Sequence, residues 1–192
     1  MDPQQLCAPE AGQVQPDTEV KRYLYSIIGD DVPRDRIDAF VENGPAALQF
    51  VRDHSAADFT WVPQYSDYYP EAPGGQANGR SVEPKPINGH VIGAELDRLT
   101  KSYTKAPAGM VVTQADFRKI SLGLRTIGGP LTMIKVFLTR MLTMALGKRM
   151  YGMGMAMMIG MRKGLIDRDI PVWYETPLTD LEVEDGRVTG SW

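Results

Sequence analysis

The sequence predicts an α+β fold, with helical segments first and a small antiparallel β unit at the C-terminal end. Two observations predict this order. Apolar residues recur at helical spacing from Asp17 onward. After residue 170 the pattern changes to short β-branched and aromatic runs around an Asp185-Gly186 turn. The composition, with 43% hydrophobic and 23% charged residues, is that of a globular domain.

The N-terminal part is predicted to contain three short helices. Residues 1–16 hold several prolines and a glycine, and are predicted to be an irregular lead-in to a single domain over 17–192. The first helix is predicted over 17–28, where an aspartate supplies the N-cap and a glycine follows the last turn. The second is predicted over 33–44, and Pro45 opens the third.

The central part begins with a predicted strand over 59–62, which is followed by a long loop over 63–86 that is rich in proline, glycine and tyrosine. Long ordered loops are usually functional. Further helices are predicted over 93–100, 113–122, 130–146 and 150–164. Thr113 and Asp116 have the spacing of a capping box at the start of one of them. The helix from Pro130 is apolar almost all round, so we expect it to pack against other protein.

The C-terminal β unit is predicted to contain strands over 170–174 and 178–183 and a last strand after the Asp185-Gly186 turn. The last strand reaches the end of the chain within a few residues, which is typical of a truncated sheet.

Several functional classes are excluded by composition. Cys7 is the only cysteine, so an intrachain disulfide and a cysteine-based metal site are excluded. The net charge of -3, without a recognisable nucleic-acid-binding module, argues against a nucleic-acid partner. Charged residues interrupt the apolar stretch 131–161, so a membrane span is not expected. The start carries no secretory signal, which favours the cytoplasm. His54 and His90 have no partner motif and receive no role, and no metal site is predicted.

The most informative segment is the loop, which reads YSDYYPEAPGG over 65–75 and GRS over 79–81. It resembles the FAD-dependent 3-ketosteroid Δ1-dehydrogenases, which have a Pro-Asp-Tyr-Tyr loop and a following Gly-Arg-Ser in their FAD-binding domain. The resemblance implies that Tyr68, the first tyrosine of the pair, faces the active site and assists proton transfer, and that Tyr65 lines the steroid pocket. Composition alone favours another interpretation, a surface loop whose tyrosines cover the core.

The resemblance also implies the chemistry. A second tyrosine removes a proton from C2 of the steroid while N5 of the flavin accepts hydride from C1, and Tyr68 hydrogen-bonds that second tyrosine. A phenol, with an ordinary pKa of about 10, is suited to such proton transfer. The second tyrosine has no match in this sequence. Asp67 and Glu71, in the same loop, are predicted to be solvated carboxylates, with Arg80 as a structural partner.

A second motif reads GMGMAMM over 152–158 and fails as a dinucleotide-binding fingerprint, because it lacks a third glycine and a preceding strand. Together with TPLTDL over 176–181, it resembles a flavoprotein pattern of a small-residue helix and a strand pair, which fumarate reductase relatives share. That resemblance implies FAD contacts at Gly154, Ala156 and Leu178.

The resemblance covers 17–190 and implies a partial FAD-binding domain, without the GxGxxG start and without the family's catalytic domain. We therefore expect the isolated chain to bind FAD weakly or not at all and to need a missing catalytic segment. The implied partners are a steroid substrate and an external electron acceptor. Two alternatives stay open: another fumarate reductase-type FAD-dependent oxidoreductase, or an inactive truncated remnant.

No acidic residue lies between Asp116 and Asp167, whereas basic residues recur along this stretch. One interpretation is a surface that faces another domain or a partner. The other is a peripheral membrane face, because a basic amphipathic helix can lie in an anionic lipid interface and would suit delivery of a steroid.

Overall fold

The computed structural model describes residues 17–100 and 110–191, so the predicted lead-in over 1–16 lies outside the described residues. The structure contains helices and small antiparallel sheets of two strands each, which confirms the α+β class. The helices are α2 (Asp17–Ile28), α3 (Arg34–His54), η1 (Gly89–Arg98), α4 (Gln114–Ser121), η3 (Gly123–Arg125), α5 (Gly128–Ala145) and α6 (Met153–Ile166). The strands are β1 (Phe59–Trp61), β2 (Val82–Pro84), β3 (Ile87–Asn88), β4 (Met150–Tyr151), β5 (Leu181–Glu184) and β6 (Arg187–Ser191).

The N-terminal helices α2 and α3 pack against each other. The prediction of α2 is confirmed, whereas the prediction of two further helices is wrong. α3 runs through Pro45 as one helix. A proline inside a helix leaves the carbonyl four residues earlier without its donor, so the sequence favoured a break there. Contacts with α2 and the burial of Ile37 and Val41 stabilise the helix before the proline, and Leu48 is half-buried after it. Tyr25 and Lys21 of α2 both contact Asp38 of α3 and hold the pair together.

Two short sheets connect distant parts of the chain. β1 pairs with β2, with Thr60 opposite Glu83, so the two ends of the long loop lie side by side. β3 pairs with β4, which places Ile87 opposite Tyr151. β4 was not predicted, because a pair of two-residue strands is shorter than any pattern of alternation. The helix predicted over 93–100 is instead the 3-10 helix η1, with Gly93 at a φ of 55° inside it.

The core lies where α6 packs against η1 and the β3–β4 pair. Ile92, Leu96 and Ile159 are buried together, and Ile87 and Tyr151 cover them. Two glycines of α6 allow its backbone to come close to the turn after α3: a Cβ on Gly160 would lie 2.5 Å from the amide nitrogen of Ala57. The small residues that the sequence places in this helix therefore act in close packing of protein against protein.

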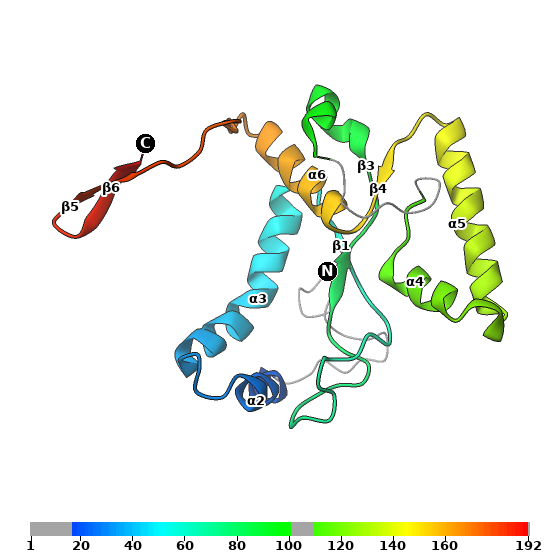
Figure 1. Ribbon diagram of the computed structural model, residues 1–192, viewed down its shortest axis with the longest axis horizontal. Coiled ribbons are helices and arrows are strands. Elements are labelled where there is room, and N and C mark those ends of the chain that lie inside the picture. Colours follow the sequence, from blue (N-terminus) through cyan, green and yellow to red (C-terminus); the bar gives the residue numbers. More distant parts are fainter. Residues whose placement is uncertain (1–16, 101–109, 192) are drawn as a thin grey trace.

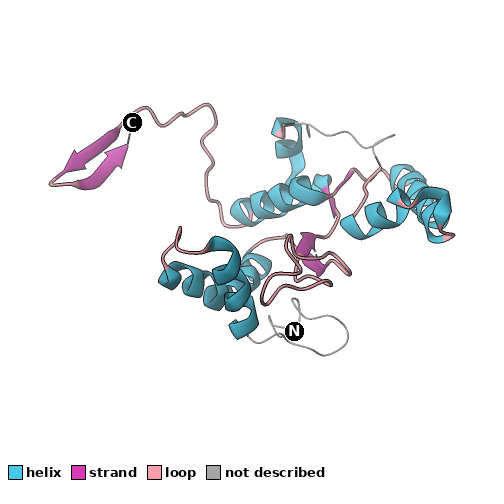
Figure 2. Ribbon diagram, turned by 60° about the horizontal axis from the view of Figure 1, so that its bottom comes forward, coloured by secondary structure: helices cyan, strands magenta, loops and turns pink. Residues whose placement is uncertain are grey.

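The α4–α5 hairpin and the β5–β6 hairpin lie at opposite edges of the molecule, away from this core (Figures 1 and 2). Thr113 caps α4 by accepting a hydrogen bond from the amide of Asp116, as predicted. α5 begins at Gly128, two residues before the predicted Pro130. The predicted turn between β5 and β6 is confirmed, with both Asp185 and Gly186 at positive φ, as a tight two-residue hairpin loop requires.

The strand predicted over 170–174 is wrong. The residues between α6 and β5 form an extended linker without strand pairing, visible in Figure 1 as the path from α6 to the hairpin. β-branched and aromatic residues favour a strand only where a neighbouring strand pairs with them, and none of the described residues does so here. The linker is instead attached through Tyr174, whose hydroxyl donates to Glu95 of η1 and whose ring lies 4.8 Å from the guanidinium of Arg98.

Candidate functional site

The loop singled out in the sequence connects β1 to β2 and is closed by hydrogen bonds across its base. The amide of Val62 donates to the carbonyl of Ser81 at 3.0 Å, directly after the strand pair ends. Further along, the amide of Asp67 donates to the carbonyl of Gln76, and the amide of Gln76 donates back to the Asp67 carboxylate. The loop is therefore a built structure and not a loose connection.

An ion pair lies inside this loop. The Arg80 guanidinium contacts the Asp67 carboxylate at 2.7 Å and donates to the carbonyl of Gly74 at 2.6 Å. The Asp67 side chain is only 9% exposed, so the prediction of a solvated carboxylate is wrong for this residue. The prediction that Arg80 is its structural partner is confirmed. The sequence could not show the burial, because it depends on the loop folding back over 13 positions.

The two tyrosines predicted for catalysis and substrate binding lie on this loop but differ in exposure. The Tyr68 side chain is 89% exposed, so no described residue encloses it. That it faces an active site stays a prediction. Tyr65 is half-buried, beside Gly79, where an added Cβ would collide with the Tyr65 carbonyl oxygen.

The three residues predicted to contact FAD lie in two separate places. Gly154 is exposed in the first turn of α6, and a Cβ there would meet nothing within 4 Å. No side chain caps this helix, so its first amides are open to a polar ligand group. Ala156, two residues further along the helix, is buried by protein and has only its backbone to offer. Leu178 is exposed on the linker before the β5–β6 hairpin.

Sequence reasoning missed a polar cluster around Glu95 of η1. Glu95 accepts hydrogen bonds from Tyr174 and from Arg162 of α6, and Arg98 lies 3.8 Å away. The Tyr174 hydroxyl, and after it Arg162, lowers the pKa of Glu95 below its ordinary value. The members are 79 and 67 positions apart from Glu95, so no local pattern could have shown the cluster. It anchors the linker to the core.

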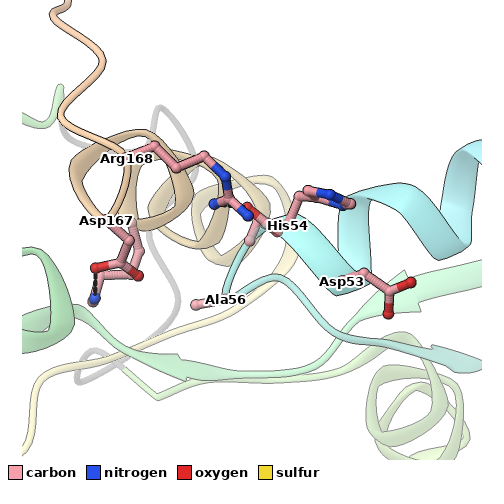
Figure 3. A pocket seen from close by; sticks show the side chains of 7 residues that line it. Asp53, His54, Ala56, Asp167 and Arg168 are labelled. Carbon is pink, nitrogen blue, oxygen red and sulfur yellow. Dashed lines mark hydrogen bonds and ion pairs between the residues drawn. The ribbon is translucent and has the colours of Figure 1, made fainter.

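An open hollow of about 450 Å³ lies where α3 and α6 end, among seven residues (Figure 3). Arg168, just after α6, extends toward the end of α3 and donates to the carbonyls of His54 and Gly164. Lys163 and Asp167 pair along the side of α6. None of the predicted site residues lines this hollow, and we assign it no ligand.

The surface of the α4–α5 hairpin combines exposed apolar side chains with basic ones. At the connection between the two helices Leu124 is 92% and Ile127 82% exposed. Along α5 the exposed apolar side chains are Leu131, Met133, Ile134, Phe137, Leu138, Met141, Leu142 and Met144. Only Gly129, Thr132 and Val136 of this helix are buried. Among the described residues the expected packing against other protein is therefore limited to one face of α5, which lies against α4 and η3.

Two searches of the described residues gave negative results. Within 17–100 and 110–191, no cluster of three or more histidine, cysteine, aspartate or glutamate side chains is placed to hold a metal ion. No helix in those same ranges is long and apolar enough to cross a bilayer.

Comparison with known families gives a match to the FAD binding domain over residues 4–192. The chain belongs to this family. The prediction of FAD as the cofactor is thereby confirmed, and the exposed first turn of α6 at Gly154 is compatible with a cofactor contact.

The predicted resemblance to ketosteroid dehydrogenases is also confirmed. A curated 3-oxosteroid 1-dehydrogenase of Mycolicibacterium smegmatis is 46% identical to this chain over 90% of the length of this chain. One of Mycobacterium tuberculosis is 44% identical over 88% of the length of this chain. The crystal structure of 3-ketosteroid delta1-dehydrogenase from Sterolibacterium denitrificans, in complex with 1,4-androstadiene-3,17-dione, superimposes on 97% of the chain with a TM-score of 0.83 and 27% identity. The chain spans 30% of the length of each curated relative and 35% of the crystallised one.

Proposed function

We propose that this chain contributes its FAD-binding part to an enzyme that introduces a C1–C2 double bond into 3-ketosteroids. In that reaction the C1–H and C2–H bonds break, hydride leaves C1 for the flavin, a proton leaves C2 for a base, and an external acceptor reoxidises the flavin. The observation that carries the proposal is the 46% identity to a 3-oxosteroid 1-dehydrogenase across 90% of the chain. An identity of 46% over 172 residues supports a shared fold, and the crystallised relative covers 97% of the chain with a TM-score of 0.83.

We assign proton-transfer assistance to Tyr68 and steroid contact to Tyr65. An exposed phenol on an anchored loop is available to a substrate or to a second segment that completes the site. The half-buried ring of Tyr65 suits contact with a flat apolar molecule. The base that removes the C2 proton is assigned to a segment outside this chain. In this proposal Tyr68 orients and shares a proton with that base.

The contacts assigned to FAD are the backbone at Gly154 and Ala156 and the surroundings of Leu178. When bound, the flavin supplies the hydride acceptor. The uncapped first turn of α6 favours a polar or negatively charged group, because its free amides and the helix dipole both point toward it. Gly154 leaves room for a close approach to the backbone.

The test of this proposal compares variants of two neighbouring tyrosines. They are made in the longest polypeptide that is translated with these residues in it. Tyr68→Phe is expected to lower the rate of steroid dehydrogenation by about 10²- to 10⁴-fold, the usual contribution of proton transfer. Tyr69→Phe is the matched control, because it removes a phenol hydroxyl from the neighbouring residue. It is expected to keep the rate, because no proton transfer is assigned to Tyr69. An unchanged rate in Tyr68→Phe removes Tyr68 from the mechanism.

Two readouts separate the alternatives. Reduction of fumarate with no steroid turnover favours a fumarate reductase-type oxidoreductase, and absence of both activities with FAD bound favours a remnant. Flavin absorbance of the purified 192-residue chain tests the prediction that it binds FAD weakly, and stoichiometric yellow colour contradicts it.

We also propose that the α4–α5 hairpin lies on an anionic membrane surface. Two observations favour this proposal. Leu124 and Ile127 are almost fully exposed at the tip of the hairpin. Over the whole hairpin, several basic residues stand beside a single acidic one, Asp116. A protein partner would have to supply acids and a large apolar face together, whereas an anionic lipid interface offers both at once. Apolar burial and basic side chains near such a surface each add to binding.

Cosedimentation with lipid vesicles tests this contact. The protein is expected to bind vesicles of phosphatidylcholine with phosphatidylserine, and to bind vesicles of phosphatidylcholine alone much less. The double variant Leu124→Ser/Ile127→Ser is expected to weaken binding at least about tenfold, because each side chain otherwise buries apolar surface in the interface. Phe40→Ser, which removes an equally exposed ring from α3, is the matched control. Equal binding by both variants contradicts the proposal.

A further inference from the structure

The exposed side chain of Tyr68 has no enclosure of its own, so its direction must be set by the backbone that carries it. Tyr68 directly follows Asp67, whose amide and carboxylate are both used in hydrogen bonds within the loop. It directly precedes Tyr69, whose amide donates to the hydroxyl of Tyr23 on α2 at 3.3 Å. The residue is thus held from both sides.

Asp67 is the centre of the first of these attachments. Its Oδ2 accepts from Nη2 of Arg80 at 2.7 Å and from the amide of Gln76 at 3.0 Å. Arg80 Nη2 also donates to the carbonyl of Gly74, so one guanidinium group connects Asp67 with Gly74 across the loop. Because the pair is largely shielded from water, at 9% and 17% side-chain exposure, its attraction is screened much less than that of a surface pair.

The second attachment fastens the loop to α2. The Arg80 guanidinium carbon lies 5.3 Å from the centre of the Tyr23 ring, and Tyr23 is itself buried. Nε and Nη1 of Arg80 are buried without a hydrogen-bond partner among the described residues, and a cation–π contact with the ring stabilises the guanidinium there. Gly74 comes so close to α2 that a Cβ would lie 2.4 Å from the Glu19 carbonyl oxygen.

From this geometry we propose that Asp67 and Arg80 are positioning residues that hold Tyr68 in its working direction. The proposal rests on the proton-transfer role proposed for Tyr68. Neither residue touches the reacting atoms in this assignment. Arg80 acts through Asp67 and the Tyr23 ring on the backbone of residues 67–69, and through it on the phenol.

The first experiment tests the attachment itself, in the 192-residue chain, by amide hydrogen exchange. In Arg80→Met the amides of Asp67 and Gln76 are expected to exchange at least about tenfold faster, while those of α6 keep their rates. Arg80→Lys keeps the charge but not the planar group over Tyr23, so its loop is expected to exchange at an intermediate rate. Arg52→Met removes a comparable arginine from the pair with Asp58, and it is expected to leave the loop amides unchanged.

The second experiment tests the positioning role in the longest translated form, by steroid turnover. Arg80→Met is expected to lower kcat about 10- to 100-fold with little change in KM, because a small misplacement of a reacting group has effects of that size. Arg80→Lys is expected to recover part of the rate. In a Tyr68→Phe background, Arg80→Met is expected to cost nothing further, because it acts through the phenol that is already gone.

The outcomes separate the two proposals. If Tyr68→Phe keeps full activity, the role proposed for Tyr68 fails, whatever Arg80 does. If Tyr68→Phe loses activity but Arg80→Met keeps it, or lowers it by the same factor in both backgrounds, the positioning role is overturned and the ion pair is merely structural. Unchanged exchange of the loop amides in Arg80→Met overturns it as well.

Discussion

α5 and α6 are both apolar, methionine-rich helices, yet one leaves its surface exposed and the other forms the core. Ile159 of α6 is completely buried, whereas most of the large side chains of α5 lie open. The difference lies in the small residues. Gly160 and Gly164 let the backbone of α6 approach the turn after α3, and η1 covers its other side. α5 has α4 and η3 as its main neighbours among the described residues.

The contrast shows that apolar composition specifies a need for a partner without specifying which one. α6 finds its partners within this chain, so its side chains stabilise the fold. Among the described residues α5 is covered on one face only, so the apolar surface of its other face is available for a contact with something else. The two helices should therefore respond in opposite ways to the same substitution.

The largest expected effect is that of Ile159→Ala. Removing a fully buried side chain from the core among Ile92 and Leu96 is expected to lower the free energy of unfolding by about 2–5 kcal/mol. The matched change in α5, Leu138→Ala, is expected to alter it by less than about 0.5 kcal/mol because that side chain is exposed. Urea denaturation of both variants provides the measurement. Similar losses in the two would mean that α5 is covered in solution.

The next effect concerns close backbone approach. Gly160→Ala places a Cβ 2.5 Å from the amide nitrogen of Ala57, so α6 must move away, at an expected cost of about 1–3 kcal/mol. Gly154→Ala, in the first turn of α6, meets nothing within 4 Å and is expected to stabilise the protein by up to about 1 kcal/mol. Thermal unfolding should therefore move in opposite directions for two chemically identical changes. A lower melting temperature in both would contradict the role given to space at Gly160.

A smaller effect tests whether the α4–α5 hairpin unfolds together with the core. Thr113→Ala removes the side-chain cap of α4 and is expected to cost that helix about 1 kcal/mol. If the hairpin opens independently, hydrogen exchange over 114–145 should speed up while the global melting temperature stays the same. A drop in the melting temperature of the whole chain would show instead that hairpin and core form one cooperative unit.

Much of this fold was predictable where local chemistry decides it. α2 follows from its apolar spacing and the glycine after it, and the β5–β6 turn from Asp185-Gly186, which accept positive φ. The predictions failed where packing outweighed a local signal. α3 runs through Pro45, and the aromatic run at 170–174 stays unpaired. For α3 the deciding contacts come from α2, and for 170–174 no described strand is present to pair with the run.

The candidate site shows the same division. The sequence pointed to the loop at 65–81 and to Arg80 as a partner, because the motif is local. It did not show that Asp67 is buried, or that the Tyr23 ring of α2 lies under Arg80. The contact between Asp67 and Arg80 joins positions 13 residues apart, and the one between Tyr23 and Tyr69 joins positions 46 apart. Burial of a charged side chain is a property of the folded surroundings and cannot be read from spacing.

The smallest expected effect concerns Asp58 and the way in which the free energy of unfolding depends on pH. Burial alone would raise the pKa of Asp58, but hydrogen bonds from Lys85 and from the amide of Phe59 outweigh it and hold that pKa below its ordinary 3.8. A carboxylate with a lowered pKa in the folded state stabilises that state at a pH above its ordinary value. The contribution is lost as the pH falls through the lowered value.

Asp58→Asn should therefore reduce the loss of stability on acidification below about pH 5, measured by urea denaturation at several pH values. The slope should not vanish, because Asp38 and Glu95 have lowered pKa values too. Lys85→Met should reduce it as well, since it removes a hydrogen bond that lowers the pKa of Asp58. The same acid slope in wild type and Asp58→Asn would mean that the Lys85 contact is not maintained in solution. The attachment of β1 to the strand after the loop would then rest on backbone pairing alone.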